Sequence, residues 1–160
     1  MIIAFSLNGE SVEVNTVPHR RAVDLLREDF QQRSLRQHCI DASCGSCLIL
    51  MDDCPALSCI LPAFELRSRD IWTMEGLSQA KSYADITTGF QSAQLQLCAA
   101  CAPARALATE ALLRKTQRPS VEQARESAGS VLCGCSPTSR ILDGILRSAR
   151  LRKERRHESQ

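Results

Sequence analysis

The spacing of the cysteines is the feature that most limits how this 160-residue chain can fold. Eight of its nine cysteines form two sets of four. The first set reads C-x4-C-x2-C-x11-C and consists of Cys39, Cys44, Cys47 and Cys59. The second set reads C-x2-C-x31-C-x-C and consists of Cys98, Cys101, Cys133 and Cys135. A fold that uses these thiols together has to bring each set to one point, and the second set must do so across a long spacer.

Four thiolates at these spacings predict iron-sulfur clusters. The first three cysteines of the first set repeat the spacing of a plant-type 2Fe-2S ferredoxin. Thiolate sulfur is a soft donor that suits iron, and four thiolates complete two tetrahedral iron sites. Two sets therefore predict two 2Fe-2S clusters, and one-electron transfer becomes the leading hypothesis.

Two other interpretations of the cysteines remain open. The C-x2-C pairs Cys44–Cys47 and Cys98–Cys101 are also typical of a structural zinc site, although zinc leaves the other four cysteines unexplained. A redox-active dithiol at Cys98–Cys101 would need a βαβ context that the sequence lacks. The ninth cysteine, Cys54, falls outside both spacings and is interpreted as a surface thiol.

Composition excludes several classes of function. A net charge of +2, from 20 basic and 18 acidic residues, gives no basic surface for nucleic acid. The first nine residues lack the basic start and apolar run of a signal peptide, and no apolar stretch reaches transmembrane length. We therefore expect no membrane association and a cytoplasmic location. An odd number of cysteines in such a chain favours metal ligation over disulfides.

The first half of the chain has the pattern of a small sheet crossed by a helix. Alternating apolar residues on both sides of Asn8-Gly9 predict a hairpin over 3–14, and helical spacing predicts a helix over 22–30. A second hairpin is predicted from the runs 48–51 and 56–61, with its turn at 52–55, and 71–74 adds a strand.

After Gly76 the composition changes to alanine, leucine and glutamine, which favours helices. Helices are predicted over 83–97, from Pro103, after a capping box at Ser120 and Gln123, and over 141–149. We therefore expect three segments. They are a β domain over 1–76 with the first cysteine set, a helical domain over 77–151 with the second, and a charged, frayed tail over 152–160.

The order of these features resembles the small iron-sulfur subunit of molybdenum-pterin hydroxylases, the family of xanthine dehydrogenases, aldehyde oxidoreductases and aerobic carbon monoxide dehydrogenases. The resemblance spans about residues 1–150, and its motifs are specific. They are Phe5-Ser6-Leu7-Asn8-Gly9, Asp24-Leu25-Leu26-Arg27-Glu28, Cys44-Gly45-Ser46-Cys47, Ser58-Cys59 and the two spacings of the second set.

The resemblance implies an α+β fold, with an N-terminal β-grasp plant-type 2Fe-2S ferredoxin domain followed by a C-terminal four-helix-bundle 2Fe-2S domain. It implies the non-substrate-binding subunit of an oxidoreductase complex, in which a large partner subunit binds molybdopterin while a further subunit binds FAD. Electrons would pass from molybdopterin through the second cluster and then the first toward the flavin. Cys135 would be the point next to the pterin where electrons enter. The alternative is a diverged structural or interaction module that binds zinc or clusters without a relay role.

The sequence also departs from the family pattern near the ligands. His38 and Ser43 stand where the family usually has glycine before the first two ligands of the first set. Ala99 and Ala100 replace the glycine and aromatic residue between the first two ligands of the second set. Gln96 lies one position before the place of a glutamine that reaches the pterin in the family, so pterin contact is not predicted from it.

Overall fold

The computed structural model describes residues 1–158 and begins with the predicted N-terminal hairpin. Strand β1 (Ile2–Leu7) pairs antiparallel with β2 (Glu10–Asn15). Asn8 and Gly9 both adopt positive φ, of 54° and 87°, in the turn between them. Two such residues form the tight turn whose twist matches a hairpin, as the Asn-Gly pair predicts.

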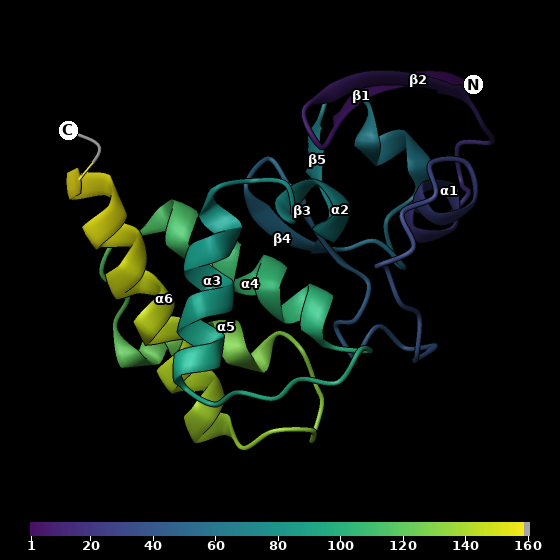
Figure 1. Ribbon diagram of the computed structural model, residues 1–160. Coiled ribbons are helices and arrows are strands. Elements are labelled where there is room, and N and C mark those ends of the chain that lie inside the picture. Colours follow the sequence, from purple (N-terminus) through teal and green to yellow (C-terminus); the bar gives the residue numbers. More distant parts are fainter. Residues whose placement is uncertain (159–160) are drawn as a thin grey trace.

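The remaining elements place all the strands before the long helices. In chain order they are α1 (Ala22–Glu28), β3 (Leu48–Met51), β4 (Cys54–Leu57), the 3-10 helix η1 (Ala63–Leu66), β5 (Asp70–Trp72), α2 (Met74–Leu77), α3 (Ser82–Ser92), α4 (Ala102–Lys115), α5 (Val121–Gly129) and α6 (Thr138–Glu158). The strands form a mixed sheet of order β2-β1-β5-β3-β4, in which β1 and β5 are parallel and the other neighbours antiparallel. The mixed α+β fold class predicted from the sequence is confirmed (Figure 1).

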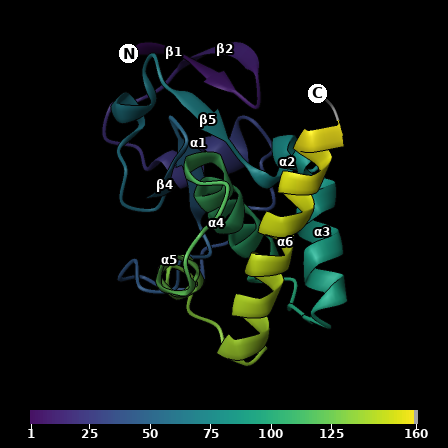
Figure 2. The ribbon, with the colours of Figure 1, turned by 90° about the vertical axis from the view of Figure 1, so that its left-hand side faces the viewer.

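Strand β3 is buried on both faces, which explains why its sequence is a continuous apolar run. Ile49 packs in the cluster that contains Leu25 and Leu26 of α1. Leu48 and Leu50 point the other way, into the cluster that contains Leu107 of α4. The sheet therefore lies between α1 and the helices of the C-terminal half (Figure 1). Figure 2 faces the helical half, and α1 lies farther from the viewer.

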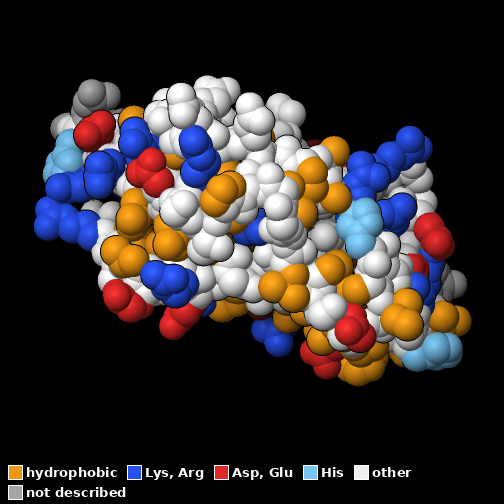
Figure 3. Space-filling view, turned by 90° about the horizontal axis from the view of Figure 1, so that it is seen from below, with side chains coloured by type: hydrophobic (Ala, Val, Ile, Leu, Met, Phe, Trp, Pro, Cys, Tyr) orange, Lys and Arg blue, Asp and Glu red, His pale blue; other side chains and the backbone are white. Residues whose placement is uncertain are grey.

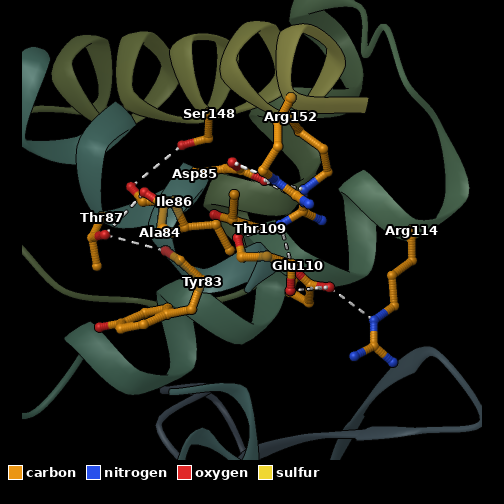
Figure 4. A network of polar contacts seen from close by, with 12 residues as sticks. Tyr83, Ala84, Asp85, Ile86, Thr87, Thr109, Glu110, Arg114, Ser148 and Arg152 are labelled. Carbon is orange, nitrogen blue, oxygen red and sulfur yellow. Dashed lines mark hydrogen bonds and ion pairs between the residues drawn. The ribbon is translucent and has the colours of Figure 1, made fainter. Parts of the chain in front are cut away.

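A network of buried charges joins the helices to one another. Arg152 on α6 donates to Asp85 on α3, at 3.1 Å, and to Glu110 on α4, at 2.7 Å (Figure 4). All three side chains are at most 6% exposed. Removing one partner from such a group leaves buried charge without compensation, which makes the network a strong specification of how these helices pack.

Arg114 extends the network from α4 to the sheet. Its guanidinium pairs with Glu110 at 3.0 Å and with Asp53 in the turn between β3 and β4. It also lies 5.0 Å from the centroid of the Trp72 ring, in a cation–π contact. The helical half and the β half are therefore joined by polar contacts as well as by the apolar cluster.

Two predicted boundaries differ from the structure because of positive backbone φ angles. Asp52 and Asp53 both adopt positive φ, so the second hairpin has a two-residue turn and Cys54 already pairs with Met51 in β4. Helix α3 ends at Ser92 rather than at 97, because Gln94 has a φ of 52° and the Leu95 N–H returns to the Phe90 carbonyl. That arrangement is a Schellman-type C-terminus.

The predicted frayed tail is wrong for the part that the structure describes. Helix α6 continues through Glu158, because Arg152 is drawn inward by Asp85 and Glu110. Residues 159 and 160 of the predicted tail lie outside the described residues. No helix within 1–158 combines the length and the apolar character needed to cross a membrane.

The buried network should contribute strongly to stability. We expect Arg152→Ala to lower the free energy of unfolding by about 3 kcal/mol, because it removes the buried cation that Asp85 and Glu110 share. Each carboxylate would keep only one, more exposed partner, Arg155 or Arg114. For a chain of this size that corresponds to about 6–12 °C in melting temperature, measured by circular dichroism. Arg147→Ala is the control, since it breaks only an exposed pair with Asp143 and should cost less than about 1 kcal/mol. Equal shifts for the two variants would contradict the prediction.

Candidate metal centre

The structure brings all four cysteines of the second set together. Their Sγ atoms lie within 4.8 Å of one another. The Cys98 sulfur is 3.5 Å from that of Cys101 and 3.6 Å from that of Cys133, and the sulfurs of Cys101 and Cys135 are 3.4 Å apart. Four convergent sulfurs with no other donor type among the described residues fit a thiolate-ligated iron-sulfur cluster, which is the group that this spacing predicts.

Each half of the second set is held by local backbone structure. Cys98 and Cys101 lie in the turn that opens α4, where the N–H groups of Cys101 and Ala102 donate to the Cys98 carbonyl at 3.2 and 3.0 Å. Cys133 and Cys135 come from the connection between α5 and α6. The long spacer between the two halves therefore contains α4 and α5, which run out from the site and return to it.

The thiols of the second set are electrostatically unequal. Hydrogen bonds with the Cys101 backbone N–H, and with the thiols of Cys101 and Cys133, lower the pKa of Cys98 to about 6. Burial, followed by the neighbouring thiols of Cys135 and Cys98, raises the pKa of Cys101 to about 12. Crowded thiols cannot all ionise without a cation to balance them, so this site favours binding of a metal group that accepts the thiolates.

The first set is arranged in two pairs. The antiparallel hairpin puts Cys47, just before β3, beside the segment that follows β4 and carries Cys59. Ser58 secures this junction, since its hydroxyl donates to the Cys47 carbonyl at 2.7 Å. In the other pair, the Cys44 N–H donates to the Cys39 sulfur at 3.4 Å. Within residues 1–158 no second group of metal-binding side chains is as compact as that of the second set, so the first set is the more open of the two.

The thiols of the first set are also unequal. Partial burial acts to raise the pKa of Cys44, but hydrogen bonds from the Ser46 backbone and from Cys39 outweigh it and lower this pKa to about 7. Burial, together with the hydrogen bond and charge of Cys47, raises the pKa of Cys59 to about 12. Both sets therefore combine a thiol that ionises easily with one that does not.

The two cysteine segments touch each other directly. The Leu132 N–H, next to Cys133, donates to the Cys44 carbonyl at 2.9 Å. Gly45 has a φ of 73°, and a β-carbon there would stand 2.1 Å from the Ser130 carbonyl oxygen. Glycine is thus required at this point, both for its backbone conformation and for the close approach of the two segments. Cys44 of the first set and Cys133 of the second are therefore connected through the backbone and a single hydrogen bond, the one between Leu132 and Cys44.

A polar pocket of about 710 Å³ opens beside Cys135. Gln91, Gln94 and Gln96 line it together with Arg140, and the Ser136 hydroxyl donates to the Gln96 carbonyl. The sequence does not predict a pterin contact for Gln96, yet this residue shares the pocket with the exposed Cys135. The sequence gives no indication that Gln91, Gln94 or Arg140 line a pocket either, because these helix and loop residues, far apart in the sequence, meet only in the tertiary structure.

Cys54 lies apart from both cysteine sets, whereas His38 adjoins the first. Cys54 is exposed on β4 and pairs with Met51, at the opposite end of the hairpin from Cys47 and Cys59. His38 is exposed in the loop before Cys39. Figure 3 shows one face of the molecule, on which hydrophobic side chains spread between groups of Lys and Arg at its two ends.

Comparisons with known proteins agree with this geometry. Residues 73–146 match the family described as the 2Fe-2S binding domain. A nicotinate dehydrogenase subunit from Pseudomonas putida KT2440 is 30% identical over 152 residues, which are 95% of this chain and 97% of that protein. A probable xanthine dehydrogenase subunit from Bacillus subtilis is 34% identical over 150 residues, which are 93% of this chain and 84% of that protein. This chain belongs to the family of small iron-sulfur subunits of molybdenum-pterin hydroxylases.

The solved structures support the same membership. Quinoline 2-oxidoreductase from Pseudomonas putida 86 superposes with a TM-score of 0.86 at 29% identity, over 98% of this chain and 96% of that one. The resemblance inferred from the sequence motifs and the cysteine spacings is therefore confirmed, and this iron-sulfur subunit is an electron-transfer component of an oxidoreductase.

Gly45 should be essential to the contact between the two cysteine segments of this iron-sulfur subunit. We expect Gly45→Ala to cost about 3 kcal/mol of unfolding free energy, because the left-handed backbone and the clash with Ser130 add together. Iron content, measured on the purified protein, should fall as well. Gly129→Ala is the control, since a β-carbon at Gly129 meets nothing within 4 Å. A Gly45→Ala protein with normal iron and stability would contradict this interpretation.

The unequal thiols should be visible in the metal-free subunit. At pH 7 Cys98 is mainly thiolate and Cys101 is mainly thiol, and only the thiolate is nucleophilic. We expect iodoacetamide to modify Cys98 at least about tenfold faster than Cys101, as followed by mass spectrometry of peptides. Lowering the pH from 7 to 5 should slow Cys98 by about tenfold, because the fall passes through its pKa. Equal rates at Cys98 and Cys101 would contradict the assignment.

Proposed function

We propose that this subunit relays electrons through two 2Fe-2S clusters, from a molybdopterin centre in a large partner subunit toward FAD in another. Cys98, Cys101, Cys133 and Cys135 would ligate one cluster, and Cys39, Cys44, Cys47 and Cys59 the other. Each bound cluster would accept and release one electron. The observation that carries the proposal is the convergence of the four second-set sulfurs within 4.8 Å.

The direct contact between the two sets supports a relay rather than two independent sites. The hydrogen bond from the Leu132 N–H to the Cys44 carbonyl connects a neighbour of Cys133 with a ligand of the first set. The fit of Gly45 against Ser130 holds these segments at backbone contact distance. A rigid, continuous connection of this kind favours transfer between the two sites because their separation stays fixed.

The surroundings of Cys135 support electron entry from the molybdopterin side. Cys135 is exposed, and it lines the 710 Å³ pocket with Gln96 and Arg140. Amide and guanidinium groups there can bind the polar edge of a pterin or its phosphate. Cys135 would then be the ligand nearest the partner, as the resemblance implies.

The names of the relatives suggest the substrate class of the complex. Nicotinate dehydrogenase and quinoline 2-oxidoreductase are named for nitrogen heterocycles. We propose that the complex oxidises a compound of that class, with the substrate pocket in the molybdenum subunit. The same proposal includes a division of the chain into two domains between residues 76 and 77. The first would be a β-grasp domain and the second a four-helix bundle, and the protein would be cytoplasmic.

A zinc-binding or interaction module without a relay role is the second candidate, and it is not favoured. Two C-x2-C pairs suit zinc, but Cys44–Cys47 and Cys98–Cys101 lie in different sites. The matching family is described as binding 2Fe-2S. Of the two candidates, only the relay accounts for all eight thiols.

Metal analysis and electron paramagnetic resonance test the relay. Anaerobically purified protein should contain about four iron and four sulfide per chain, and dithionite should produce two distinct one-electron signals. Cys133→Ala should abolish one signal and Cys47→Ala the other. Cys54→Ala is the control and should leave both. Zinc without labile sulfide would refute the relay and favour the interaction module.

A further inference from the structure

Arg105 is a buried arginine that links the two halves of the second cysteine set. It lies one turn into α4, and its backbone N–H donates to the Cys101 carbonyl at 3.0 Å. Only 4% of the residue is exposed. Its guanidinium crosses to the other half of the set, where it donates to the carbonyls of Ala128 at 3.1 Å, Val131 at 3.0 Å and Cys133 at 3.3 Å. The Arg105 side chain, from the helix that follows Cys101, thus fixes the backbone that leads to Cys133.

The charge of Arg105 has no carboxylate partner within residues 1–158. No Asp or Glu oxygen of this part of the chain lies within ion-pair distance of its guanidinium, although Arg152 and Arg114 both have buried acidic partners. Its Nε is buried and has no hydrogen-bond partner among the same residues. A buried cation that is bound only by neutral carbonyls is costly unless an anionic group nearby balances it. The candidates for that group are the thiolates of the second set, whose member Cys133 already accepts from Arg105 through its carbonyl.

We propose that Arg105 is a positioning residue for the second cluster and supplies the positive charge that favours its reduced state. The proposal rests on the proposed function, since it requires these four cysteines to hold a 2Fe-2S cluster. A four-thiolate cluster is anionic, and the one electron that it accepts adds one more negative charge. A fixed buried cation beside the site stabilises the more negative state in the low dielectric of the interior.

The same side chain also affects the connection between the two sets. The segment that Arg105 holds runs from Ala128 to Cys133, and it contains Ser130, against which Gly45 packs. It also contains Leu132, the donor to the Cys44 carbonyl. The planar guanidinium fork therefore fixes both the position of the Cys133 ligand and the surface that meets the first set. Lysine would keep the charge, but it cannot reproduce the fork.

Two substitutions in the assembled complex separate charge from geometry. Arg105→Gln removes the charge and keeps one amide donor, whereas Arg105→Lys keeps the charge and loses the fork. Arg118→Gln is the matched control, since Arg118 is exposed beyond the far end of α4, about 20 Å along the helix from Cys101. Iron content and the reduction potential of each cluster, from redox titration followed by electron paramagnetic resonance, are the measurements.

We expect Arg105→Gln to lower the ratio of reduced to oxidised second cluster at a fixed potential by about tenfold, which is 59 mV for one electron. Arg105→Lys should keep this ratio within about twofold of wild type, but it should lose iron from the second cluster to a chelator faster. Arg118→Gln should match wild type. If Arg105→Gln loses only the electron paramagnetic resonance signal of the second cluster, that result would also support the positioning role. The effect of the charge would then be measured from the reduction potential of the second cluster in Arg105→Lys.

Three results would overturn the inference. Both Arg105 variants could keep wild-type potentials and iron retention, which would show that the side chain has no effect on the cluster. Equal potential shifts in Arg105→Gln and Arg118→Gln would show only a general charge effect. Loss of both clusters in both variants would show a role in the whole fold. A wild-type complex without a second signal would instead refute the proposed function.

Discussion

The backbone contact between Cys44–Gly45 and the segment before Cys133 controls how the two halves of this protein fit together. Gly45 leaves no room for a side chain against Ser130, and the Cys44 carbonyl accepts from Leu132. Such a contact cannot be adjusted by a change of rotamer, so the two cysteine segments either meet at this distance or separate. The shared apolar cluster between β3 and α4 serves the same end, since it sets the sheet and helices at the spacing that the contact needs.

Buried charge is used for two different purposes in the helical half. In the network of Asp85, Glu110 and Arg152 each charge has a partner, and the result is a fixed packing of three helices. Arg105 is buried to a similar degree, but its hydrogen bonds within residues 1–158 go to carbonyl groups. The contrast has a physical basis. A paired charge is neutralised within the fold, whereas an unpaired one retains a field that acts on the thiolates beside it.

Much of the fold follows from local sequence patterns. The predicted and observed elements differ where no local pattern indicates the structure. The Asn8-Gly9 turn and the Ser120 capping box form as predicted, because their residues fix the backbone locally. The predicted end of α3 is wrong because Gln94, which has no strong preference for positive φ, takes the role that glycine usually has. The predicted tail is wrong because a run of arginines has the composition of a solvated end, and only the positions of Asp85 and Glu110 show that Arg152 is buried.

The chain alone predicts which thiols belong together, since the spacings of the two sets are typical of cluster ligation and the motifs around them resemble one family. It also shows the order of sheet and helices, because periodicity and turn residues act over short distances. Three relations become visible only in the folded molecule. The two sets touch, Gln96 and Arg140 meet at Cys135, and Arg105 joins the two halves of one set. These relations connect residues far apart in the sequence, and no local pattern encodes a contact that depends on how whole elements pack.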